Sequence, residues 1–551
     1  MTGTADTVFV DGSYFTEGMA SSRRGAVAVA GGRIVAVGDQ DDVVALRGPR
    51  TEVVDLAGGL LLPGFQDAHV HPIAAGVDML RCDVHASTST DETLRLVAAY
   101  AASHPDVAWV AGSGWSMDQF PGGTPSRAVL DSVVPDRPAF LTNRDGHGAW
   151  VNTRALELAG LTADTPDPAD GRIEREPDGT PQGTLHEGAM QLVERLLPPV
   201  TAQEQRAGLL TAQQHLLSLG VTAWQDAAVG ALFGADDLLP VYLDADADGV
   251  LVARVVGALW WDRARSGDQI PDLVARRGDG GTGRFRPTSV KIMLDGVAEN
   301  FTAAMLEPYL DGCGHHTENS GLDFVDPVGL PEYVTRLDAA GFQVHFHALG
   351  DRAVRHALDA VGAARTANGP DGGRHHLAHL QVVHPDDLPR FARVGATANV
   401  QTLWAAHEPQ MDELTIPFLG DRRASWQYPL AGLVRAGAAL CAGSDWPVSS
   451  ADPLDAVHVA VTRRVPDADE GTPAFFADEA VPLATALTAY TAGSARVNGL
   501  ADLSGRLEAG LEADLAVLDR DPFAGRPDEV AQAAVVATYV GGEHVYQQGG
   551  R

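Results

Sequence analysis

The sequence predicts an α/β fold in which a (β/α)8 TIM barrel carries a large insertion after its first strand and a small β-sandwich domain built from both ends of the chain. Apolar, strand-like runs alternate with Ala-rich helical stretches through the middle of the chain, as in a parallel sheet whose strands are joined by helices. Near both ends the pattern changes to short alternating strands separated by turns. A length of 551 residues with 45% hydrophobic content is sufficient to bury a large core.

The two ends of the chain have strand patterns of the same style. Residues 7–56 contain short alternating runs, with Gly31–Gly32 between two of them, and Gly541–Gly542 occupies the same setting near the other end. Paired glycines between alternating runs are typical of tight β-hairpin turns. Neither segment buries enough area to be stable alone, so we expect residues 1–60 and 499–551 to form one sandwich.

The middle region, residues 61–498, contains ten candidate strands, two more than a closed barrel requires. The candidates are 59–67, 107–114, 138–145, 220–227, 251–259, 288–296, 342–350, 375–383, 395–402 and 438–447. The excess disappears if residues from about 75 to 205 form an insertion that carries the second and third candidates outside the barrel. Within this insertion, the polar and turn-rich stretch 164–184 is typical of a surface loop or a flap.

The composition excludes several classes of partner. Only 40 Lys and Arg residues oppose 73 Asp and Glu, and the net charge of −33 repels nucleic-acid phosphates and anionic lipid surfaces. The 3 cysteines are far apart and predict neither a disulfide framework nor a thiolate zinc site. The first residues do not resemble a secretory signal, and no run approaches the roughly 20 apolar residues that span a bilayer. We therefore expect a cytoplasmic protein without nucleic-acid or membrane partners, and leave open whether it forms a homodimer.

One basic residue differs from all the others. Lys291 is the single lysine among the 40 basic residues, and the remaining 39 are arginines. A buried lysine can lose its proton and act as a nucleophile, for instance toward carbon dioxide, whereas arginine stays protonated. The count indicates either that position 291 needs an amine or that one lysine has survived by chance.

Ligand-type side chains occur at or near the carboxyl ends of the predicted barrel strands. They are His69, His71, Lys291, His347, His379 and Asp445. These strand ends converge on one mouth of a barrel, where active sites of this fold are built. His69 and His71 are two positions apart, so in an extended segment both side chains leave the same side and can hold one ion. The pattern predicts a metal site at the mouth.

The motifs around these residues resemble those of a known superfamily. The segments LLPGFQDAHVHP, VKIMLDG, HALGDRAV and GSDWPV, in this order, resemble the metal-dependent amidohydrolase superfamily. Within it, RDGHGAWVN, GVTAWQD, HALGDRAV and GRLEAGLEADLAVLDRDP are similar to amidohydrolase family 3, which includes N-substituted formamide deformylases. The resemblance extends from about residue 7 to residue 546.

The resemblance implies a role for each ligand-type residue. His69 and His71 would bind the more buried metal, and His347 and His379 the second. Lys291 would bridge the two ions as a carboxylated lysine, which agrees with the independent lysine count. Asp445 would ligate the first metal and accept a proton. Imidazole and carboxylate ligands with an open position favour zinc, as one or two ions.

Other residues near the motifs are candidates for contacts with the substrate. His147, in the insertion, is the candidate donor to the oxyanion or a substrate contact. Trp115, Arg144, Gln401, Trp404 and Trp446 are further candidates for lining the pocket.

Two positions near the motifs leave questions open. His345 precedes His347 by two positions and shares its side of the strand, so either can be the ligand. Relatives usually carry Glu directly before the histidine at 379, where this chain has Ala378. This difference bears on whether the substrate of the relatives can be assigned to this chain, and less on metal binding. Glu187 and Asp226 end apolar stretches and either orient a ligand histidine or cap a local turn.

These residues together predict a metal-dependent hydrolase that uses activated water on a carbon–nitrogen bond of the amide or formamide type in a small, non-peptide substrate. Hydrolysis of an ester, lactone or carbamate at the same site is the alternative. A decarboxylase or a noncatalytic binding protein is the third interpretation, against which the complete ligand set argues.

Overall fold

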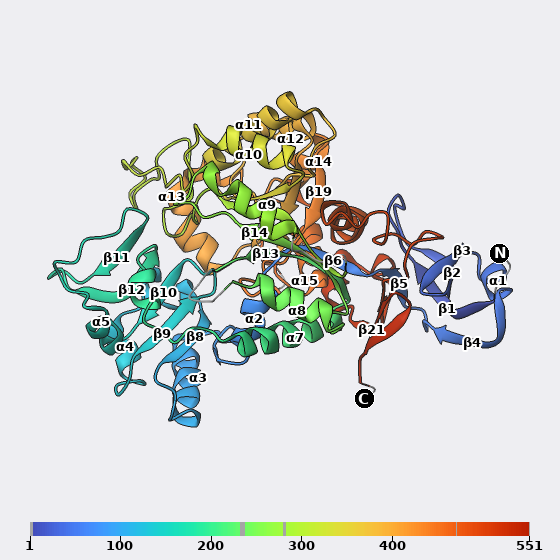
Figure 1. Cartoon of the computed structure of the whole chain (residues 1–551), viewed down its shortest axis with the longest axis horizontal. Coiled ribbons are helices and arrows are strands. Elements are labelled where there is room, and N and C mark those ends of the chain that lie inside the picture. Colours follow the sequence, from blue (N-terminus) through green and yellow to red (C-terminus); the bar gives the residue numbers. More distant parts are fainter. Residues whose placement is uncertain (1–3, 232–236, 279–282, 470, 550–551) are drawn as a thin grey trace.

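The computed structural model describes residues 4–231, 237–278, 283–469 and 471–549. Three β-sheets lie along the long axis of the molecule, and each belongs to a different part of the chain (Figure 1). The sheet of the insertion lies at one end, the barrel lies in the middle, and the sheet formed by the two chain termini lies at the other end. Within these ranges, no helix combines the length and the apolar character that crossing a membrane requires.

The central sheet is the predicted eight-stranded parallel barrel. Its strands, in order around the sheet, are β6 (Phe65–Val70), β13 (Val221–Val229), β14 (Arg254–Trp260), β15 (Phe285–Met293), β16 (Gln343–Ala348), β17 (His376–His379), β18 (Thr397–Val400) and β19 (Ala439–Ala442). All seven neighbouring pairs are parallel. The first and last strands are connected by the Asp445 backbone N–H, which donates to the His69 carbonyl at 2.8 Å. The predicted fold class is thus confirmed.

Alternation along the strands separates the apolar core from the barrel interior. In β16, Val344 and Phe346 join the apolar core, whereas His345 and His347 face the barrel interior. Successive side chains of a strand point to opposite faces, so the sequence QVHFHA places both histidines on one side. This pattern brings polar groups into a barrel whose outer surface is covered by helices.

Helices follow the barrel strands in the chain. Those associated with the barrel are α2 (Pro72–Met79), α7 (Ala202–Ser218), α8 (Leu239–Ala247), α9 (Ile270–Gly278), α10 (Leu330–Ala339), α11 (Asp351–Asn368), α12 (Leu388–Val394), α13 (Ile416–Ala424), α14 (Leu430–Arg435), α15 (Pro453–Thr462), α16 (Leu483–Thr488) and α17 (Ser494–Val497). Helix α7 begins with a capping box in which Thr201 and Glu204 satisfy each other's backbone N–H groups. Helix α11 buries alanine and valine side chains against the core and ends before Gly369.

The first predicted strand, 59–67, is divided between two sheets. Its first half is β5 (Leu60–Pro63), which pairs with β1 and β20 of the terminal sheet, and its second half begins the barrel strand β6 at Phe65. Gly64 lies at the junction, where a Cβ atom would come within 2.4 Å of the Thr222 side chain. The apolar residues on the two sides of Pro63–Gly64 therefore belong to different domains.

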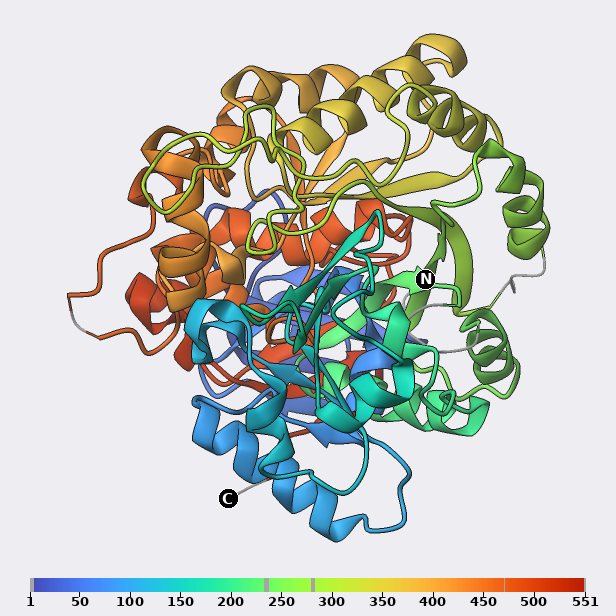
Figure 2. The same ribbon diagram turned by 90° about the vertical axis from the view of Figure 1, so that its left-hand side faces the viewer.

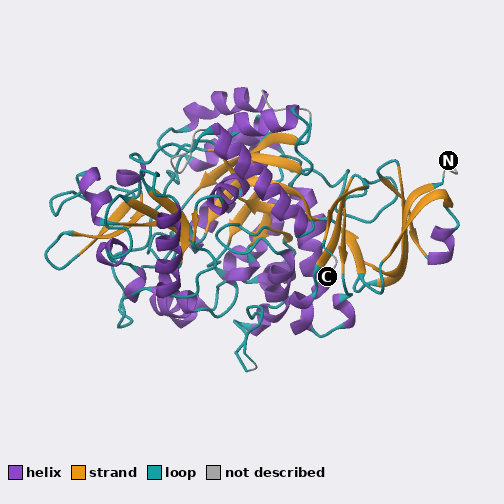
Figure 3. Ribbon diagram, turned by 90° about the horizontal axis from the view of Figure 1, so that it is seen from below, coloured by secondary structure: helices purple, strands orange, loops and turns teal. Residues whose placement is uncertain are grey.

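Strands from both chain ends form the terminal sheet. Their order across the sheet is β22 (Glu543–Gln547), β21 (Val535–Val540), β20 (Leu515–Leu518), β5, β1 (Ala5–Tyr14), β2 (Arg23–Ala30) and β3 (Arg33–Gly38). Strand β4 (Arg47–Asp55) pairs with β1 outside this order. These strands lie together at one end of the molecule (Figure 3). Hydrogen bonds link them into one path, which bends so that Phe9 of β1 packs edge-on against Tyr539 of β21, with ring centroids 5.1 Å apart. Gly31–Gly32 and Gly541–Gly542 have positive φ angles at the predicted hairpin turns. The layered packing of a sandwich is thus obtained from a single curved sheet.

The insertion forms a six-stranded sheet with its own helices. Its strands are β7 (Cys82–Asp83), β8 (Val110–Trp115), β9 (Ala139–Asn143), β10 (Gly148–Val151), β11 (Gly171–Arg175) and β12 (Pro181–Glu187), and its helices are α3 (Thr90–Ser103), α4 (Arg127–Asp131), α5 (Thr153–Ala159) and α6 (Gln191–Glu194). The two candidate strands assigned to the insertion are thus β8 and β9, outside the barrel. The segment 164–184 is not simply a loop, because β11 and β12 pair antiparallel within it.

The insertion lies over one end of the barrel, as the view along the long axis shows (Figure 2). Asn300, in the loop after β15, donates from Nδ2 to the His147 carbonyl at 2.9 Å, and Thr302 Oγ1 donates to Glu187 Oε1 at 2.8 Å. Both contacts join the insertion to the carboxyl end of a barrel strand. The insertion therefore covers the mouth at which the candidate ligands converge.

Candidate metal centre

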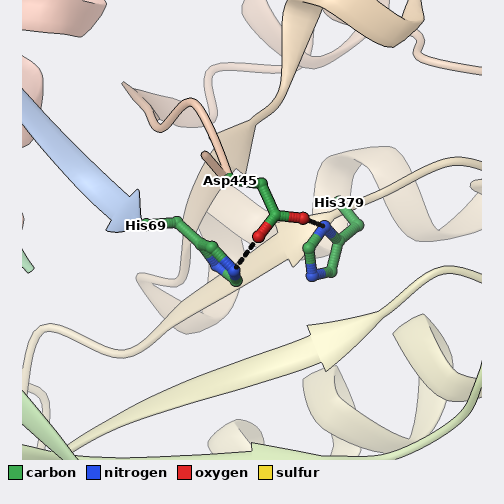
Figure 4. A group of neighbouring side chains, drawn as sticks. All are labelled: His69, His379 and Asp445. Carbon is green, nitrogen blue, oxygen red and sulfur yellow. Dashed lines mark ion pairs between the residues drawn. The ribbon is translucent and has the colours of Figure 1, made fainter. Parts of the chain in front are cut away.

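Asp445 connects three of the candidate histidines. Its Oδ1 atom lies 3.1 Å from Nε2 of His69, and its Oδ2 atom lies 3.8 Å from Nδ1 of His379 (Figure 4). The same Oδ1 atom lies 3.1 Å from Nε2 of His71. His69 is in β6, His71 begins helix α2, His379 ends β17, and Asp445 follows β19. Side chains from the first, sixth and eighth barrel strands thus meet at one point.

Two of these residues adopt backbone conformations that favour glycine. The φ angle is +57° at Asp445 and +79° at His379. The Asp445 conformation is held by its N–H, which donates to the His69 carbonyl, and the His379 N–H donates to Gln401 Oε1 at 2.6 Å. Such conformations persist where the surroundings over-determine them, and they cluster at functional sites.

His379 and His347 complete the group on its other side. Their rings are 4.4 Å apart, and both residues are buried. Neither ring nitrogen of His379 has a hydrogen-bond partner among the described residues, and Nδ1 of His347 lies 3.3 Å from Asp295 Oδ1 without hydrogen-bond geometry. Buried nitrogens without partners are rare and costly, so they indicate a missing ligand.

The donor set fits a divalent metal ion. His69, His379 and Asp445 each place one ligand atom within 4.8 Å of the others. Burial lowers the pKa of His69 to about 3 and that of His379 well below its usual value, which keeps both rings neutral with lone pairs available. Burial opposes ionisation of Asp445, but the neighbouring histidines outweigh it and hold its pKa well below the usual range. Neutral imidazoles around an ionised carboxylate are typical zinc ligands.

Lys291 lies on the inner wall of the barrel in β15, beside His345 of β16. Burial lowers the pKa of its amine to about 7, and the attraction of Asp445 opposes this shift only in part. The pKa of His69 and that of His347 are lowered by burial first and by the Lys291 charge second. The amine is therefore available in its neutral, nucleophilic form near neutral pH.

The insertion contributes His147 to the site. This residue lies in the loop between β9 and β10, and its ring centroid is 5.7 Å from that of His347. Its Nδ1 lies 3.0 Å from both carboxylate oxygens of Glu187. Burial lowers the pKa of His147, but the Glu187 carboxylate outweighs burial and raises the pKa to about 9. An imidazolium thus faces the ligand cluster from outside the barrel. Glu187 orients His147 rather than one of the candidate ligand histidines.

One of the residues predicted to contact substrate lies in an apolar core instead. Trp115 packs against Phe120 and Trp150 in the core of the insertion and donates its indole N–H to the Leu141 carbonyl at 2.7 Å. The prediction that it lines the pocket is wrong, because this core already encloses the ring.

Gln401 and Trp446 hold ligands in place. Gln401 accepts the His379 N–H, and Trp446 accepts the His71 N–H with its carbonyl at 2.9 Å while its ring packs against His215 of α7 at 4.9 Å. Both residues thus contact candidate metal ligands, and their role as substrate contacts stays a prediction.

Trp404 and Arg144 remain at the mouth. The half-buried Trp404 ring stacks on His379, with centroids 5.4 Å apart and an interplanar angle of 4°. Arg144 is 35% exposed at its side chain and lies 3.7 Å from Glu408, in the loop after β18. The insertion and this barrel loop thus form an ion pair at the rim of the site.

Several buried groups behind the ligands were not singled out from the sequence. Asp67, in the motif FQDAHVH, accepts the backbone N–H groups of His69 and Ser444 at 2.9 and 3.1 Å. Asp295, in the motif VKIMLDG, accepts three backbone N–H groups and faces His347. Both carboxylates lie in motifs that resemble the superfamily, because Asp67 precedes His69 by two positions and Asp295 follows Lys291 by four. This short spacing from the candidate ligands is the sequence signal that could have identified them.

His345 is distinguished from His347 by its partners. Its Nε2 lies 2.8 Å from His69 Nδ1, and its Nδ1 lies 2.7 Å from Gln225 Oε1, so both nitrogens are engaged. This arrangement supports the choice of His347 as the candidate ligand.

Comparisons with known proteins agree with this architecture. A family model described as the amidohydrolase family matches residues 52–546. The chain is 31% identical to Protein LONG AFTER FAR-RED 3 of Arabidopsis thaliana, over 98% of this chain and 92% of that protein. It is 28% identical to the N-substituted formamide deformylase of Arthrobacter pascens, over 100% of both chains.

Solved structures with the same overall fold include an uncharacterized metal-dependent hydrolase from Pyrococcus horikoshii OT3. This structure has a TM-score of 0.70 and 25% sequence identity, and the match covers 95% of this chain and 99% of that one. A second uncharacterized metal-dependent hydrolase, from Pyrococcus furiosus, has a TM-score of 0.68 and 26% identity over 94% and 99% of the two chains. The chain therefore belongs to the amidohydrolase family and is a metal-dependent hydrolase of that family.

Proposed function

We propose that the enzyme hydrolyses a carbon–nitrogen bond of the amide or formamide type in a small, non-peptide molecule. The observation that carries this proposal is the position of Asp445, whose carboxylate reaches His69 and His71 through one oxygen and His379 through the other. The similarity to an N-substituted formamide deformylase over the full length of both chains supports the type of bond.

The residues that would hold metal are His69, His71 and Asp445 for the more buried ion and His347 and His379 for a second ion. Imidazole and carboxylate donors favour zinc. A divalent metal bound here supplies Lewis-acid chemistry, because it lowers the pKa of a coordinated water to about 7 and polarises a carbonyl oxygen.

Asp445 is placed to move the proton that this reaction releases. The carboxylate is ionised, because its pKa is held well below the usual range, and it can accept a proton at Oδ2. The same proton can then pass to the nitrogen of the leaving amine. An amine must be protonated to leave, whereas an alkoxide needs the proton less, so this residue matters most for amide substrates.

His147 is placed to stabilise negative charge on the carbonyl oxygen. Its Nδ1–H donates to Glu187, so the imidazolium has a second N–H available for the substrate. A donor fixed in a site from which water is excluded stabilises a developing oxyanion without rearrangement. The insertion thus contributes directly to the proposed chemistry.

Lys291 would bridge the two ions as a carbamate. The neutral amine attacks carbon dioxide, a nitrogen–carbon bond forms, and one proton leaves, which yields a carboxylate at the end of the side chain. Burial favours the neutral amine that this reaction requires, because the pKa falls to about 7. Arginine cannot form this group.

The remaining expectations concern location and partners. We propose that the enzyme acts in the cytoplasm on a small molecule and has no nucleic-acid or membrane partner, on the basis of the net charge of −33. Size-exclusion chromatography with light scattering separates a monomer from a homodimer.

The proposal is tested by metal content and by a substrate screen. Purified enzyme should contain one or two equivalents of zinc, manganese or iron, and chelation should abolish turnover. N-formyl, N-acyl, carbamate and lactone compounds are then compared, with product masses recorded. A gain of water on an amide or formamide supports the proposal, whereas loss of carbon dioxide, binding without turnover or full activity of metal-free enzyme contradicts it.

A further inference from the structure

A chain of buried amides begins at two backbone carbonyls on the amino-terminal side of the barrel. Gln343, at the start of β16, donates from Nε2 to the carbonyls of Arg374 and Val497, both at 2.7 Å. Backbone carbonyls only accept hydrogen bonds, so these contacts fix which end of the amide is NH2. Gln343 Oε1 must therefore be an acceptor, and it receives the Nε2–H of Gln225 at 3.0 Å. The orientation of Gln225 is fixed in turn.

The orientation of Gln225 determines the tautomers of two histidines above it. Its Oε1 can only accept, so His345, at 2.7 Å, carries its proton on Nδ1. The two nitrogens of the buried His345 ring meet an imidazole and an amide rather than a carboxylate, so the ring is neutral and carries a single proton. Its Nε2 is then an acceptor and receives the proton of His69 Nδ1 at 2.8 Å. His69 is left with a lone pair on Nε2, the atom that faces Asp445.

A second branch of the network confirms the direction of these bonds. Gln225 Oε1 also accepts from Nε2 of His376 at 3.0 Å, which leaves Nδ1 of His376 to accept from Asn399 Nδ2 at 3.1 Å. Asn399 Nδ2 also donates to the Ala68 carbonyl at 2.9 Å, and a carbonyl requires this same amide orientation. The Asn399 Oδ1 accepts from Gln401 Nε2 at 3.0 Å. The backbone carbonyls at the two ends of the network are therefore satisfied by the same set of proton positions.

These positions place two acceptors against each other at the centre of the site. Nε2 of His69 carries a lone pair and faces the Oδ1 atom of the Asp445 carboxylate at 3.1 Å. Two ligands of one tetrahedral zinc ion, each about 2.0–2.1 Å from it, are separated by about 3.3 Å. The observed separation of 3.1 Å is close to this value.

The residues Gln343, Gln225 and His345 are here called the amide relay. We propose that the amide relay holds His69 as the Nδ1–H tautomer, so that the Nε2 lone pair is directed at the metal position before any metal binds. This inference rests on the proposed role of His69 as a metal ligand and assigns the relay residues as positioning residues. Outer hydrogen bonds of this type orient a ligand histidine and tune its metal affinity.

The direct test is the tautomer of His69 in the metal-free enzyme. Protein labelled with 15N at histidine gives separate NMR signals for protonated and unprotonated ring nitrogens, and the His69→Gln variant identifies the His69 signals. We expect a proton on Nδ1 and none on Nε2. A proton on Nε2 of His69 in the metal-free wild type overturns the proposal, whatever the substrate screen shows.

A variant series connects the tautomer to metal binding. Gln225→Met removes the acceptor at similar side-chain length, so His345 can reverse and His69 can place its proton on Nε2, toward Asp445. We expect this reversal in the NMR spectrum and a loss of zinc affinity of about 10- to 100-fold in competition with a chromophoric chelator. Unchanged zinc affinity with a reversed tautomer contradicts the proposal, and so does an unchanged tautomer.

Two further variants separate positioning from general damage to the barrel. Gln213, on α7, is also a buried amide, bonded to the Val250 carbonyl and the Val252 N–H at 3.0 and 2.7 Å, so Gln213→Met is the matched control and should leave zinc affinity unchanged. Gln225→Glu keeps an acceptor for His345, and in its protonated form it also donates to Gln343. We expect it to restore the wild-type tautomer and most of the zinc affinity. A loss as large in the Gln213 control as in Gln225→Met contradicts the proposal.

Discussion

The Nε2 atom of His69 and the Oδ1 atom of Asp445 lie 3.1 Å apart, at the junction of the first and last strands of the barrel. The same junction is held by the Asp445 N–H, which donates to the His69 carbonyl. Closure of the barrel and assembly of the site are therefore one structural event. A change that separates these strands removes both.

Replacement of Asp445 tests the proton transfer to the leaving group. Asp445→Asn keeps the shape of the side chain but removes its capacity to take up the proton, so we expect kcat/KM to fall by about 10²–10⁴-fold on an amide. The loss on a matched ester should be smaller, because an alkoxide leaves with less need of a proton. The measurement is kcat/KM for both substrates with zinc content determined in parallel. Equal losses on amide and ester contradict this role.

Replacement of Lys291 tests the bridging carbamate. Lys291→Arg keeps a positive charge and a long side chain but cannot react with carbon dioxide. We expect loss of the second metal and of most activity, measured by elemental analysis and turnover. Lys291→Glu is the companion variant, because it provides a carboxylate without carbon dioxide and should retain more metal than the arginine variant. Full occupancy of two metals in Lys291→Arg contradicts the bridging role.

The pH dependence tests the ion pair between His147 and Glu187. The pKa of His147 is raised to about 9, so the imidazolium is present below this pH and is lost as the pH rises through it. We expect kcat/KM to decline above about pH 9. Glu187→Gln removes the attraction and leaves burial, which lowers the pKa, so the decline should move to a lower pH. Thr302→Val keeps the Glu187 charge and is the control, for which the decline should stay near pH 9.

Removal of metal should destabilise the fold. The ligand nitrogens of His379 have no protein partner among the described residues, and the buried Asp445 carboxylate then lacks a cation. A ligand at 100 times its Kd stabilises the native state by about 2.7 kcal/mol. We expect chelation to lower the unfolding temperature by several degrees, as measured by calorimetry, and added zinc to restore it. Asp445→Ala should show a much smaller response to zinc, and an unchanged wild-type unfolding temperature after chelation contradicts the expectation.

The sequence predicted the parts of the fold that depend on local pattern. The alternation in QVHFHA placed His345 and His347 on one side of β16, and Gly31–Gly32 marked a hairpin, because side-chain period and turn chemistry are local properties. The division of 59–67 between two sheets at Pro63–Gly64 was not predicted, because apolar residues flank this dipeptide on both sides and belong to different sheets only in the folded chain.

The sequence predicted which residues meet at the site better than it predicted what each of them does there. The six candidate ligands lie at strand ends, and barrel geometry brings strand ends together. The same reasoning could not show that Trp115 belongs to the core of the insertion, because its neighbour Trp150 comes from another strand. Gln225 and Gln343 look like ordinary polar strand residues in the sequence, and their connection depends on the closed interior of the barrel.

The central claim is that side chains from opposite ends of the barrel sequence hold a divalent cation. It is tested most directly by a crystal structure of the enzyme grown with zinc, with anomalous diffraction recorded above and below the zinc absorption edge. We predict an anomalous peak within ligand distance, about 2.0–2.2 Å, of His69, His71 and Asp445, with a second beside His347 and His379 when two ions are bound. Well-ordered ligand side chains with no anomalous peak between them in zinc-saturated crystals would contradict the account.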